Sequence, residues 1–260
     1  MISLNGCSIT QGKYSDNSLH MRIPNYAKRD AVAITWNYEN DGELFALACV
    51  RKHLGKSISL FLPYCPYAKL DTLSSHEDVY ALKYFCEAIN DLKFANVIVH
   101  DPYSQACVTL LDNGVGITPI LYIDLTIKEI NSDKLLVFYP DENALNKYST
   151  LVQRPFGFAL KDMDWEKEVV KKIDLYGEDV KDRDILIIDN YCSAGNTFAP
   201  LIKRLKEAGA NKIYIYVTHC EKNMIDSDLI KMKDLEKIYT TNSIYPTKLP
   251  CEKISIIRTV

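Results

Sequence analysis

The sequence predicts an α/β protein made of two doubly wound domains with largely parallel sheets. Short apolar runs alternate along most of the chain with segments whose apolar residues recur at helical spacing, which is the pattern of successive βαβ units. The clearest unit lies at 185–219. There an apolar run ends at an acid and a polar turn follows. The apolar positions of 198–205 then recur every three or four residues before Gly209, and the apolar run 212–219 closes the unit.

The remaining elements follow from the same reasoning in chain order. The apolar runs 57–62, 95–100 and 156–161 are predicted as strands. The segment 74–77 has capping-box spacing and is expected to open a helix whose apolar face is Leu82, Phe85, Ile89 and Leu92. The charged segment 162–168 is interpreted as a solvated helix start, with a mobile lid as the alternative.

Bulk properties narrow the class of protein. The net charge of −3 gives no electrostatic bias toward nucleic acid or membrane partners. No apolar run is long enough to span a bilayer, and the first residues lack a signal-peptide pattern, so a cytoplasmic protein is expected. The eight cysteines form no C-x-x-C pair, which favours reduced, mostly buried thiols. Cys192 lies near a predicted helix N-terminus, and a catalytic thiol there is kept as an alternative.

The segment 189–197 has the composition of a phosphate-binding turn between a strand and a helix. It resembles the ribose-phosphate loop of the type I phosphoribosyltransferases and the ribose-phosphate pyrophosphokinases. Two acids and an Asp-Thr-Gly-Gly-Thr-like turn are usual in that superfamily, but here only the first acid, the first Gly and the last Thr are kept. The resemblance implies that the ribose phosphate is bound by Asp189, Asn190, Ser193, Ala194, Gly195, Asn196 and Thr197.

A second segment resembles the nucleotide side of the pyrophosphokinases. The sequence of 63–71, Pro-Tyr-Cys-Pro-Tyr-Ala-Lys-Leu-Asp, is similar to the family's Pro-Tyr-x-Pro-Tyr-Ala-Arg-Gln-Asp segment, which lies against ATP. The Asp-Gly-Glu at 41–43 precedes it in the family's order. The resemblance implies that ATP is bound by Asp41, Glu43, Tyr67, Lys69 and Asp71. Lys69 keeps the charge of the family's Arg but lacks its bidentate fork.

Three further positions resemble the family's metal and catalytic motifs. Asp101 matches the Asp of an Asp-x-His motif and Asp141 matches the Val-x-Pro-Asp motif, so the resemblance implies a Mg²⁺ cofactor held by these two acids. Tyr103 occupies the position of the His in that motif, and a phenol is a poor magnesium ligand at neutral pH. His100 could replace this His as a ligand only if the loop were rebuilt. Lys161 matches the Lys that begins the mobile catalytic loop. The implied catalytic residues are Lys161, Lys69 and Asp189.

The resemblance covers the chain from about Ser3 to Ile257, because late strands at 239–244 and 253–257 also match. It implies a nucleotide-side domain at 1–125, a phosphoribosyltransferase-like domain at 126–245, and a closing strand at 246–260 that returns to the first domain. By analogy with the family, ATP and a ribose phosphate are the expected partners, in a homo-oligomer.

Three functions remain open at this point. The first is transfer of diphosphate from ATP to the anomeric hydroxyl of ribose 5-phosphate, or of a related acceptor such as ADP-ribose, with release of AMP. The second is a non-catalytic homologue that binds these ligands and regulates a partner, which the altered positions would explain. The third is a phosphoribosyltransferase, against which the Pro-Tyr segment argues.

Overall fold

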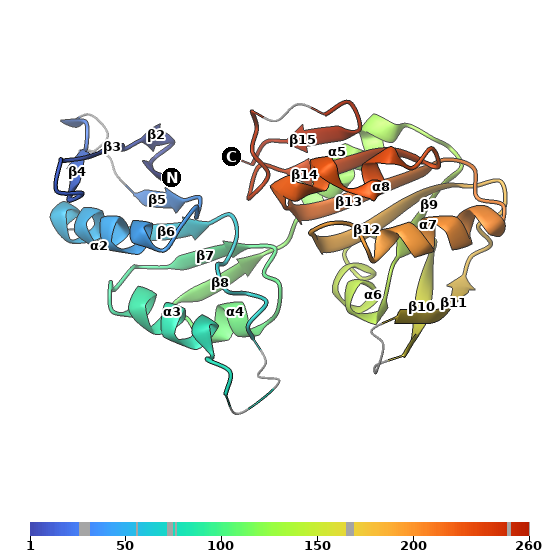
Figure 1. Ribbon diagram of the computed structural model, residues 1–260, viewed down its shortest axis with the longest axis horizontal. Helices are drawn as coiled ribbons and strands as arrows, with labels where there is room; N and C mark the ends of the chain where they lie inside the picture. Colours follow the sequence, from blue (N-terminus) through green and yellow to red (C-terminus); the bar gives the residue numbers. More distant parts are fainter. Residues whose placement is uncertain are drawn as a thin grey trace. The chain divides into compact units, whose positions relative to one another are not determined.

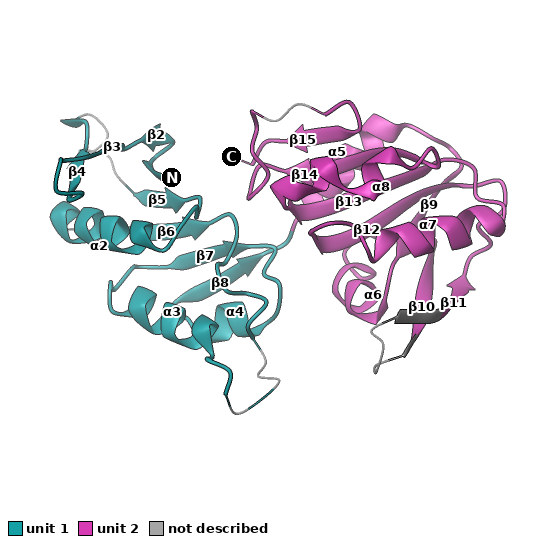
Figure 2. Ribbon diagram, in the orientation of Figure 1, with its two compact units in different colours: residues 1–118 teal, residues 119–260 magenta. Residues whose placement is uncertain are grey.

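The computed structural model describes residues 1–25, 32–55, 57–71, 75, 77–164, 169–248 and 251–259. The chain divides into two compact units, Met1–Thr118 and Pro119–Val260 (Figure 2). The division falls at 118 and not at the predicted 125, because helix α5 (Ile120–Ile130) packs in the core of unit 2. The predicted boundary therefore falls inside a helix of unit 2.

Unit 1 contains a six-stranded sheet in the order β2-β1-β5-β6-β7-β8 (Figure 1). Strands β5 to β8 are parallel, and β1 and β2 are added antiparallel at one edge. A separate hairpin is formed by β3 and β4. The strands are β1 (Ile2–Leu4), β2 (Cys7–Ser8), β3 (Thr10–Lys13), β4 (Leu19–Arg22), β5 (Ala33–Trp36), β6 (Ser59–Leu62), β7 (Val97–His100) and β8 (Gly114–Ile117).

The core of unit 1 lies on one face of this sheet. Aligned residues of β5, β6 and β7, such as Ile34, Leu60 and Val97, are buried, whereas their neighbours on the opposite face are half-buried. The buried face packs against α2 (Gly42–Leu54), α3 (Ala81–Asn90) and α4 (Ala106–Thr109). Helix α3 buries Leu82, Phe85 and Ile89 of the predicted apolar face, whereas Leu92 lies beyond its end. The helix begins at Ala81, so 75 and 77 lie in the preceding loop; 74 and 76 lie outside the described residues.

Unit 2 contains a seven-stranded sheet in the order β11-β10-β9-β12-β13-β14-β15 (Figure 1). All neighbouring strands are parallel except the β10–β11 hairpin. The strands are β9 (Leu135–Tyr139), β10 (Phe156–Asp164), β11 (Val169–Gly177), β12 (Asp184–Cys192), β13 (Ile213–Cys220), β14 (Leu235–Thr241) and β15 (Ile254–Ile257).

Helices cover both faces of the unit 2 sheet. One core contains α5 and α6 (Glu142–Tyr148), and the other contains α7 (Phe198–Glu207) and α8 (Asp228–Lys231), which follows the short 3₁₀ helix η1 (Lys222–Asp226). Side chains alternate between these cores along β12, with Ile185 and Ile187 on the α7 side and Leu186 and Ile188 on the other. The predicted α/β class with largely parallel sheets is confirmed.

Two predicted segments of unit 2 differ in the structure. The helix start predicted at 162–168 is wrong, because Asp162–Asp164 continue β10 and pair with β11; residues 165–168 lie outside the described part of the chain. The closing strand was expected to join the first domain. Instead β15 pairs in parallel with β14, which extends the sheet of unit 2.

The predicted reduced, mostly buried state of the cysteines is confirmed. None of the eight cysteines, all of which lie in the described part of the chain, forms a disulfide, and five of them are buried. Among the helices of the described residues, none has both the length and the apolar character needed to cross a bilayer.

Candidate active site

The segment that joins β12 to α7 is built around one glycine. Gly195 has a φ of +77°, and a Cβ there would lie 2.5 Å from the Cδ2 atom of Leu229, so only glycine fits without strain. The Gly195 carbonyl accepts from the amides of Phe198 (3.0 Å) and Ala199 (3.2 Å), which begins helix α7. The preceding strand is longer than the sequence predicts, because the β12–β13 ladder continues to Cys192.

The turn leaves its backbone amides available for an anion. Within the described part of the chain, the amides of residues 194–197 donate no backbone hydrogen bond. Thr197 is the N-cap of α7, yet its side chain makes no capping bond, and both Asn196 and Thr197 are exposed. The first amides of a helix carry partial positive charge and form a natural phosphate site.

The carboxyl ends of three adjacent strands bring three of the predicted site residues together. Asp141 follows β9, Lys161 lies on β10 and Asp189 on β12, and β9 is paired with both of the other strands. The Lys161 ammonium lies 3.8 Å from an Asp141 carboxylate oxygen, and the Lys161 side chain is only 13% exposed. Asp141 also caps helix α6, because its Oδ1 accepts from the Ala144 amide at 3.0 Å.

The electrostatics of this group depart from those of isolated side chains. Burial, together with the negative charge of Asp141, raises the pKa of Asp189 to about 7, although the Asn190 amide (2.7 Å), Lys161 and Lys147 act in the opposite direction. Burial lowers the pKa of Lys161, and the two carboxylates oppose that change. A carboxyl group with a pKa near neutrality beside a buried cation at a sheet edge is typical of functional sites.

The structure adds a carboxylate that the sequence analysis missed. Glu221 follows β13, and its carboxylate accepts from the Ser193 hydroxyl (2.7 Å) and the Tyr191 phenol. The Asn223 amide donates to the same Ser193 oxygen at 3.4 Å. A signal for Glu221 was present in the sequence, because residues that directly follow neighbouring parallel strands meet at one edge of the sheet.

In unit 1 the predicted nucleotide residues are only partly brought together. The Asp41 carboxylate accepts from the phenols of Tyr38 (2.5 Å) and Tyr67, and these bonds hold the pKa of Asp41 below its ordinary value. Tyr67 adopts a φ of +61°, an uncommon backbone conformation for a tyrosine that is found preferentially at functional turns. Lys69 is exposed on the same segment, and Asp71 is half-buried.

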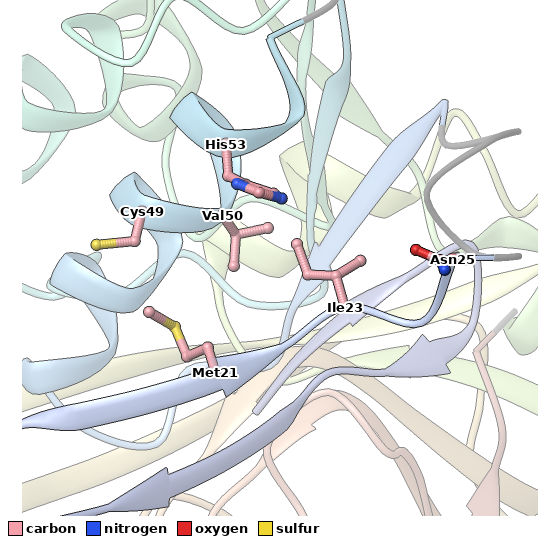
Figure 3. Close-up of a pocket in the computed structure, with 6 residues that line it drawn as sticks. All are labelled: Met21, Ile23, Asn25, Cys49, Val50 and His53. Carbon is pink, nitrogen blue, oxygen red and sulfur yellow. The ribbon is translucent and has the colours of Figure 1, made fainter.

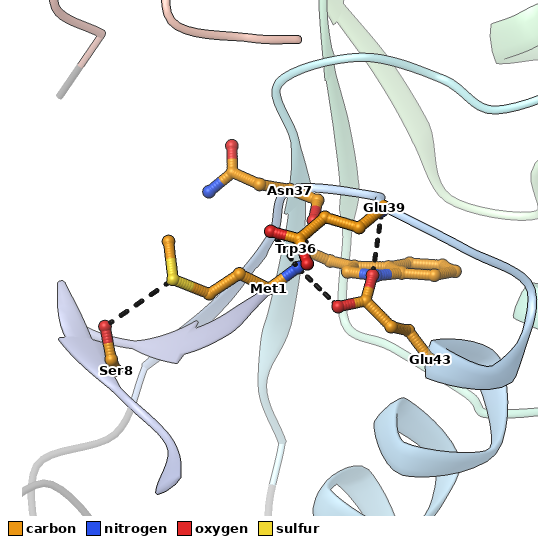
Figure 4. A network of polar contacts seen from close by, with 6 residues as sticks. All are labelled: Met1, Ser8, Trp36, Asn37, Glu39 and Glu43. Carbon is orange, nitrogen blue, oxygen red and sulfur yellow. Dashed lines mark hydrogen bonds and ion pairs between the residues drawn. The ribbon is translucent and has the colours of Figure 1, made fainter. Parts of the chain in front are cut away.

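Glu43 has a structural environment of its own (Figure 4). It is buried, and its carboxylate accepts from the Trp36 indole (2.9 Å), the Glu39 amide (2.9 Å) and the amino group of Met1 (2.5 Å). The carboxylate is thus turned into the protein, whereas Asp41, two residues earlier, is exposed.

The predicted metal residue of unit 1 is also inaccessible. Asp101 is fully buried with a φ of +44°, and His100 is 1% exposed, whereas the phenolic Tyr103 is 42% exposed. Across the residues described, no group of three His, Cys, Asp or Glu side chains forms a metal cluster. A cavity of about 340 Å³ lies elsewhere in unit 1, between the end of β4 and helix α2 (Figure 3). It is lined by Met21, Ile23, Asn25, Cys49, Val50 and His53, none of which is a predicted site residue.

Comparison with a solved structure shows the fold. The chain superimposes on the phosphoribosylpyrophosphate synthetase from Mycobacterium smegmatis with a TM-score of 0.75 and 17% sequence identity, covering 96% of this chain and 86% of that one. The fold is therefore that of a phosphoribosylpyrophosphate synthetase, a phosphoribosyltransferase-type fold. No family model matches the chain.

Curated relatives agree with the fold in the kind of protein that they indicate. Proteins named ribose-phosphate pyrophosphokinase align over most of the chain: 21% identity with that of Thermotoga maritima (98% of this chain, 84% of the relative) and 25% with that of Pyrococcus abyssi (94% and 86%). The protein of Thermosipho africanus is 23% identical over 82% of this chain and 69% of its own. The chain is therefore similar over most of its length to proteins named ribose-phosphate pyrophosphokinase.

Proposed function

We propose that this protein transfers the β,γ-diphosphate of ATP to the anomeric hydroxyl of a ribose phosphate and releases AMP. The acceptor is ribose 5-phosphate or a related ribose phosphate such as ADP-ribose. The observation that carries the proposal is the grouping of Asp141, Lys161 and Asp189 beside the amides of 194–197. The relatives' names support the same class of reaction.

In this reaction the anomeric oxygen forms a bond to the β-phosphorus of ATP as the bond from that phosphorus to the α–β bridging oxygen breaks. Such a transfer depends mostly on positioning and charge neutralisation. The amides of 194–197 hold the acceptor phosphate, and Asp189 accepts hydrogen bonds from the ribose hydroxyls. The Lys161 ammonium, held by Asp141, is placed to neutralise charge on the transferred group.

Magnesium fits the carboxylates of unit 2 and not the acid of unit 1. Asp141 and Asp189 offer hard oxygen ligands in one place, and their mutual repulsion would be relieved by a cation. Asp101 is fully buried, so it is unsuited to reach an ion that arrives with a nucleotide. We therefore propose that Mg²⁺ enters bound to ATP, where it neutralises phosphate charge, and is held by Asp141 and Asp189.

On the nucleotide side, the proposed ATP residues are Tyr67, Asp41, Lys69 and Asp71. The bond from the Tyr67 phenol to Asp41 links the Pro-Tyr segment to the Asp-Gly-Glu turn and fixes the ring. Glu43 holds this turn through hydrogen bonds inside the protein, so we do not include it among the residues that contact ATP. A homo-oligomer and a cytoplasmic location remain predictions of the family resemblance.

A second candidate function has one specific observation in its favour. The burial of Asp101 and the phenol at Tyr103 leave the first metal motif without a usable ligand among the described residues. A homologue that binds ATP and ribose phosphate without turnover, and regulates a partner, would tolerate this loss.

The deciding experiment measures AMP release from ATP and Mg²⁺ with ribose 5-phosphate and with ADP-ribose in parallel. We expect AMP with one acceptor and its loss in Lys161→Ala. Lys172→Ala is the matched control, because Lys172 lies on the paired strand β11 and its exposed side chain forms an ion pair with Asp174 (2.8 Å). Absence of AMP with both acceptors, combined with a rise in melting temperature on ligand addition, would favour the regulatory candidate.

A further inference from the structure

Two cysteine thiols of unit 1 are in contact, although they belong to distant parts of the chain. Cys65 lies in the Pro-Tyr segment 63–71, and Cys107 lies on helix α4, after the loop that begins at Asp101. The Cys65 thiol donates a hydrogen bond to the Cys107 sulfur, and both residues are buried in the core of unit 1. Two sulfur atoms in such contact need to approach by about 2 Å to reach the length of a disulfide bond.

The Cys107 sulfur is the more acidic of the two. The hydrogen bond from Cys65 lowers the pKa of Cys107 to about 6 against the effect of burial, and the Ser104 hydroxyl, 3.9 Å from the sulfur, acts in the same direction. The same contact, together with burial, raises the pKa of Cys65, whose hydrogen has the Pro66 carbonyl (3.6 Å) as a second acceptor. A thiolate beside a protonated thiol suits a two-step oxidation, because the first attacks the oxidant and the second resolves the product.

A third thiol in the same core provides an internal comparison. Cys86 lies on helix α3 and is as deeply buried as Cys107. Burial, followed by the charge of Cys107, raises the pKa of Cys86 to about 12, so this thiol stays protonated. Of the two protonated thiols, Cys65 is the one that is hydrogen-bonded to Cys107. The contacts therefore select Cys65 as the partner of the reactive sulfur.

We propose that Cys65 and Cys107 form a peroxide-sensitive dithiol, which closes to a disulfide and thereby weakens ATP binding at the Pro-Tyr segment. The Cys107 thiolate attacks hydrogen peroxide: an S–O bond forms, the O–O bond breaks, and hydroxide leaves a sulfenic acid behind. The Cys65 sulfur then attacks the oxidised sulfur, so that an S–S bond forms, the S–O bond breaks, and the Cys65 proton departs with the hydroxyl group as water. The hydroxide takes up the proton that Cys107 released on ionisation, so two thiols and one peroxide give one disulfide and two waters.

The disulfide acts on ATP through the residues that follow Cys65. Tyr67, with its φ of +61°, and Lys69 lie a few positions further along the same segment. The Asp71 carboxylate at the end of the segment is near enough for its charge to act on Cys107. Drawing Cys65 toward α4 by about 2 Å displaces these proposed ATP residues, and a misplacement of about 1 Å can cost on the order of 100-fold. This effect on ATP rests on the proposed function, whereas formation of the disulfide does not.

The test treats the full chain with hydrogen peroxide, alkylates the remaining thiols, and maps the linkage by mass spectrometry after proteolysis. We expect a disulfide between Cys65 and Cys107 that dithiothreitol reverses. By calorimetry, the Kd for ATP with Mg²⁺ should be about tenfold higher or more in the oxidised protein than in the reduced protein.

Two variants separate the disulfide from other effects of peroxide. Cys65→Ser keeps a hydrogen-bond donor for Cys107 but cannot form the disulfide. Peroxide should therefore leave a sulfenic acid on Cys107 that dimedone labels, and the Kd for ATP should stay near the value of the reduced parent. Cys86→Ala is the matched control, since it removes a buried thiol of the same core that has no part in the reaction; it should form the disulfide and lose ATP affinity as the parent does.

The outcomes are distinct. If peroxide does not link Cys65 to Cys107, or links either of them to Cys86, the switch is overturned while the proposed function stands. The same holds if the linkage forms and the affinity for ATP is unchanged. If the reduced parent protein does not bind ATP, the proposed function fails, and the switch fails with it even where the disulfide forms.

Discussion

The carboxyl group of Asp189 should reduce the stability of the ligand-free protein at neutral and alkaline pH. Burial and the neighbouring charge of Asp141 raise its pKa from an ordinary value of 3.8 to about 7. In the unfolded chain the same group ionises at its ordinary pKa, so folding must either take up a proton or bury a charge. We therefore predict that Asp189→Asn stabilises the protein.

The magnitude and its pH dependence follow from linkage. Below pH 4 the group is protonated in both states and contributes nothing. Between pH 4 and 7 each unit of rising pH lowers the free energy of unfolding by about 1.4 kcal/mol, since the unfolded state alone releases its proton. Above pH 7 the penalty is constant, at about 4 kcal/mol for a shift of about three units. Asparagine has no such penalty and can still accept from the Asn190 amide.

The assay is calorimetric melting of the parent protein and Asp189→Asn at pH 4, 6 and 8. At roughly 3 °C per kcal/mol for a unit of this size, the variant should melt about 10 °C higher at pH 8 and at the same temperature at pH 4. Its affinity for ribose phosphate should fall at least tenfold, because a charged acceptor of ribose hydroxyl hydrogen bonds is lost. Stability and binding thus change in opposite directions.

Asp184, at the other end of the apolar run in β12, provides the matched control. Burial alone would raise its pKa, but bonds from Ser132 (2.7 Å), the Lys212 amide (3.2 Å) and Asn211 (2.7 Å) hold it below the ordinary value. Its contribution to stability is present at pH 8 and lost as the pH falls, so Asp184→Asn should lower the melting temperature at pH 8. If Asp189→Asn also melts lower at pH 8, the reasoning about the site's electrostatics is refuted.

Two further predictions concern residues that support the site. Gly195→Ala should lower the free energy of unfolding by about 2 kcal/mol, because alanine is strained at a φ of +77° and meets Leu229; chemical denaturation measures it, and an unchanged stability would contradict the described turn. Glu43→Gln should destabilise by about 2 kcal/mol, because its oxygen can still accept from Trp36 and Glu39 but its NH2 group replaces the charged acceptor of the Met1 amino group. The KM for ATP of its folded fraction should stay within twofold, and a tenfold rise would return Glu43 to the nucleotide site.

The fold could be predicted largely from local patterns. The buried run of β12, the turn and the apolar face of α7 could be predicted from consecutive residues, because apolar residues recur at one spacing in a strand and at another in a helix. The pairing of strands that are distant in the sequence leaves no such local pattern. The charged residues of 162–164 resemble a helix start in sequence, but they form a strand because β11 returns beside them. The predicted domain boundary at 125 falls within helix α5 for the same reason, because the partners of this helix lie elsewhere in unit 2.

The site residues of unit 2 were predicted more completely than those of unit 1. The resemblance selected Asp141, Lys161 and Asp189, and the structure groups them. It could not separate Asp41 from Glu43, because the direction in which each carboxylate points depends on the distant Tyr67 and on Trp36. Glu221 was missed because no family motif marks it; its place follows from the strand alignment of β12 with β13.

The two aspartates of β12 explain why sequence alone does not separate a supporting acid from a functional one. Each lies at an end of the same apolar run. Among the described residues, Asp184 has three hydrogen-bond donors, whereas Asp189 has one amide donor, a like-charged neighbour and the charges of Lys161 and Lys147. An acid that only supported the fold would be expected to have donors like those of Asp184. Because Asp189 has few donors within the protein, its oxygens can accept hydrogen bonds from ribose hydroxyl groups or coordinate a cation. The proposed reaction supplies both. The stability that Asp189 removes from the ligand-free protein should accordingly be recovered when the acceptor binds.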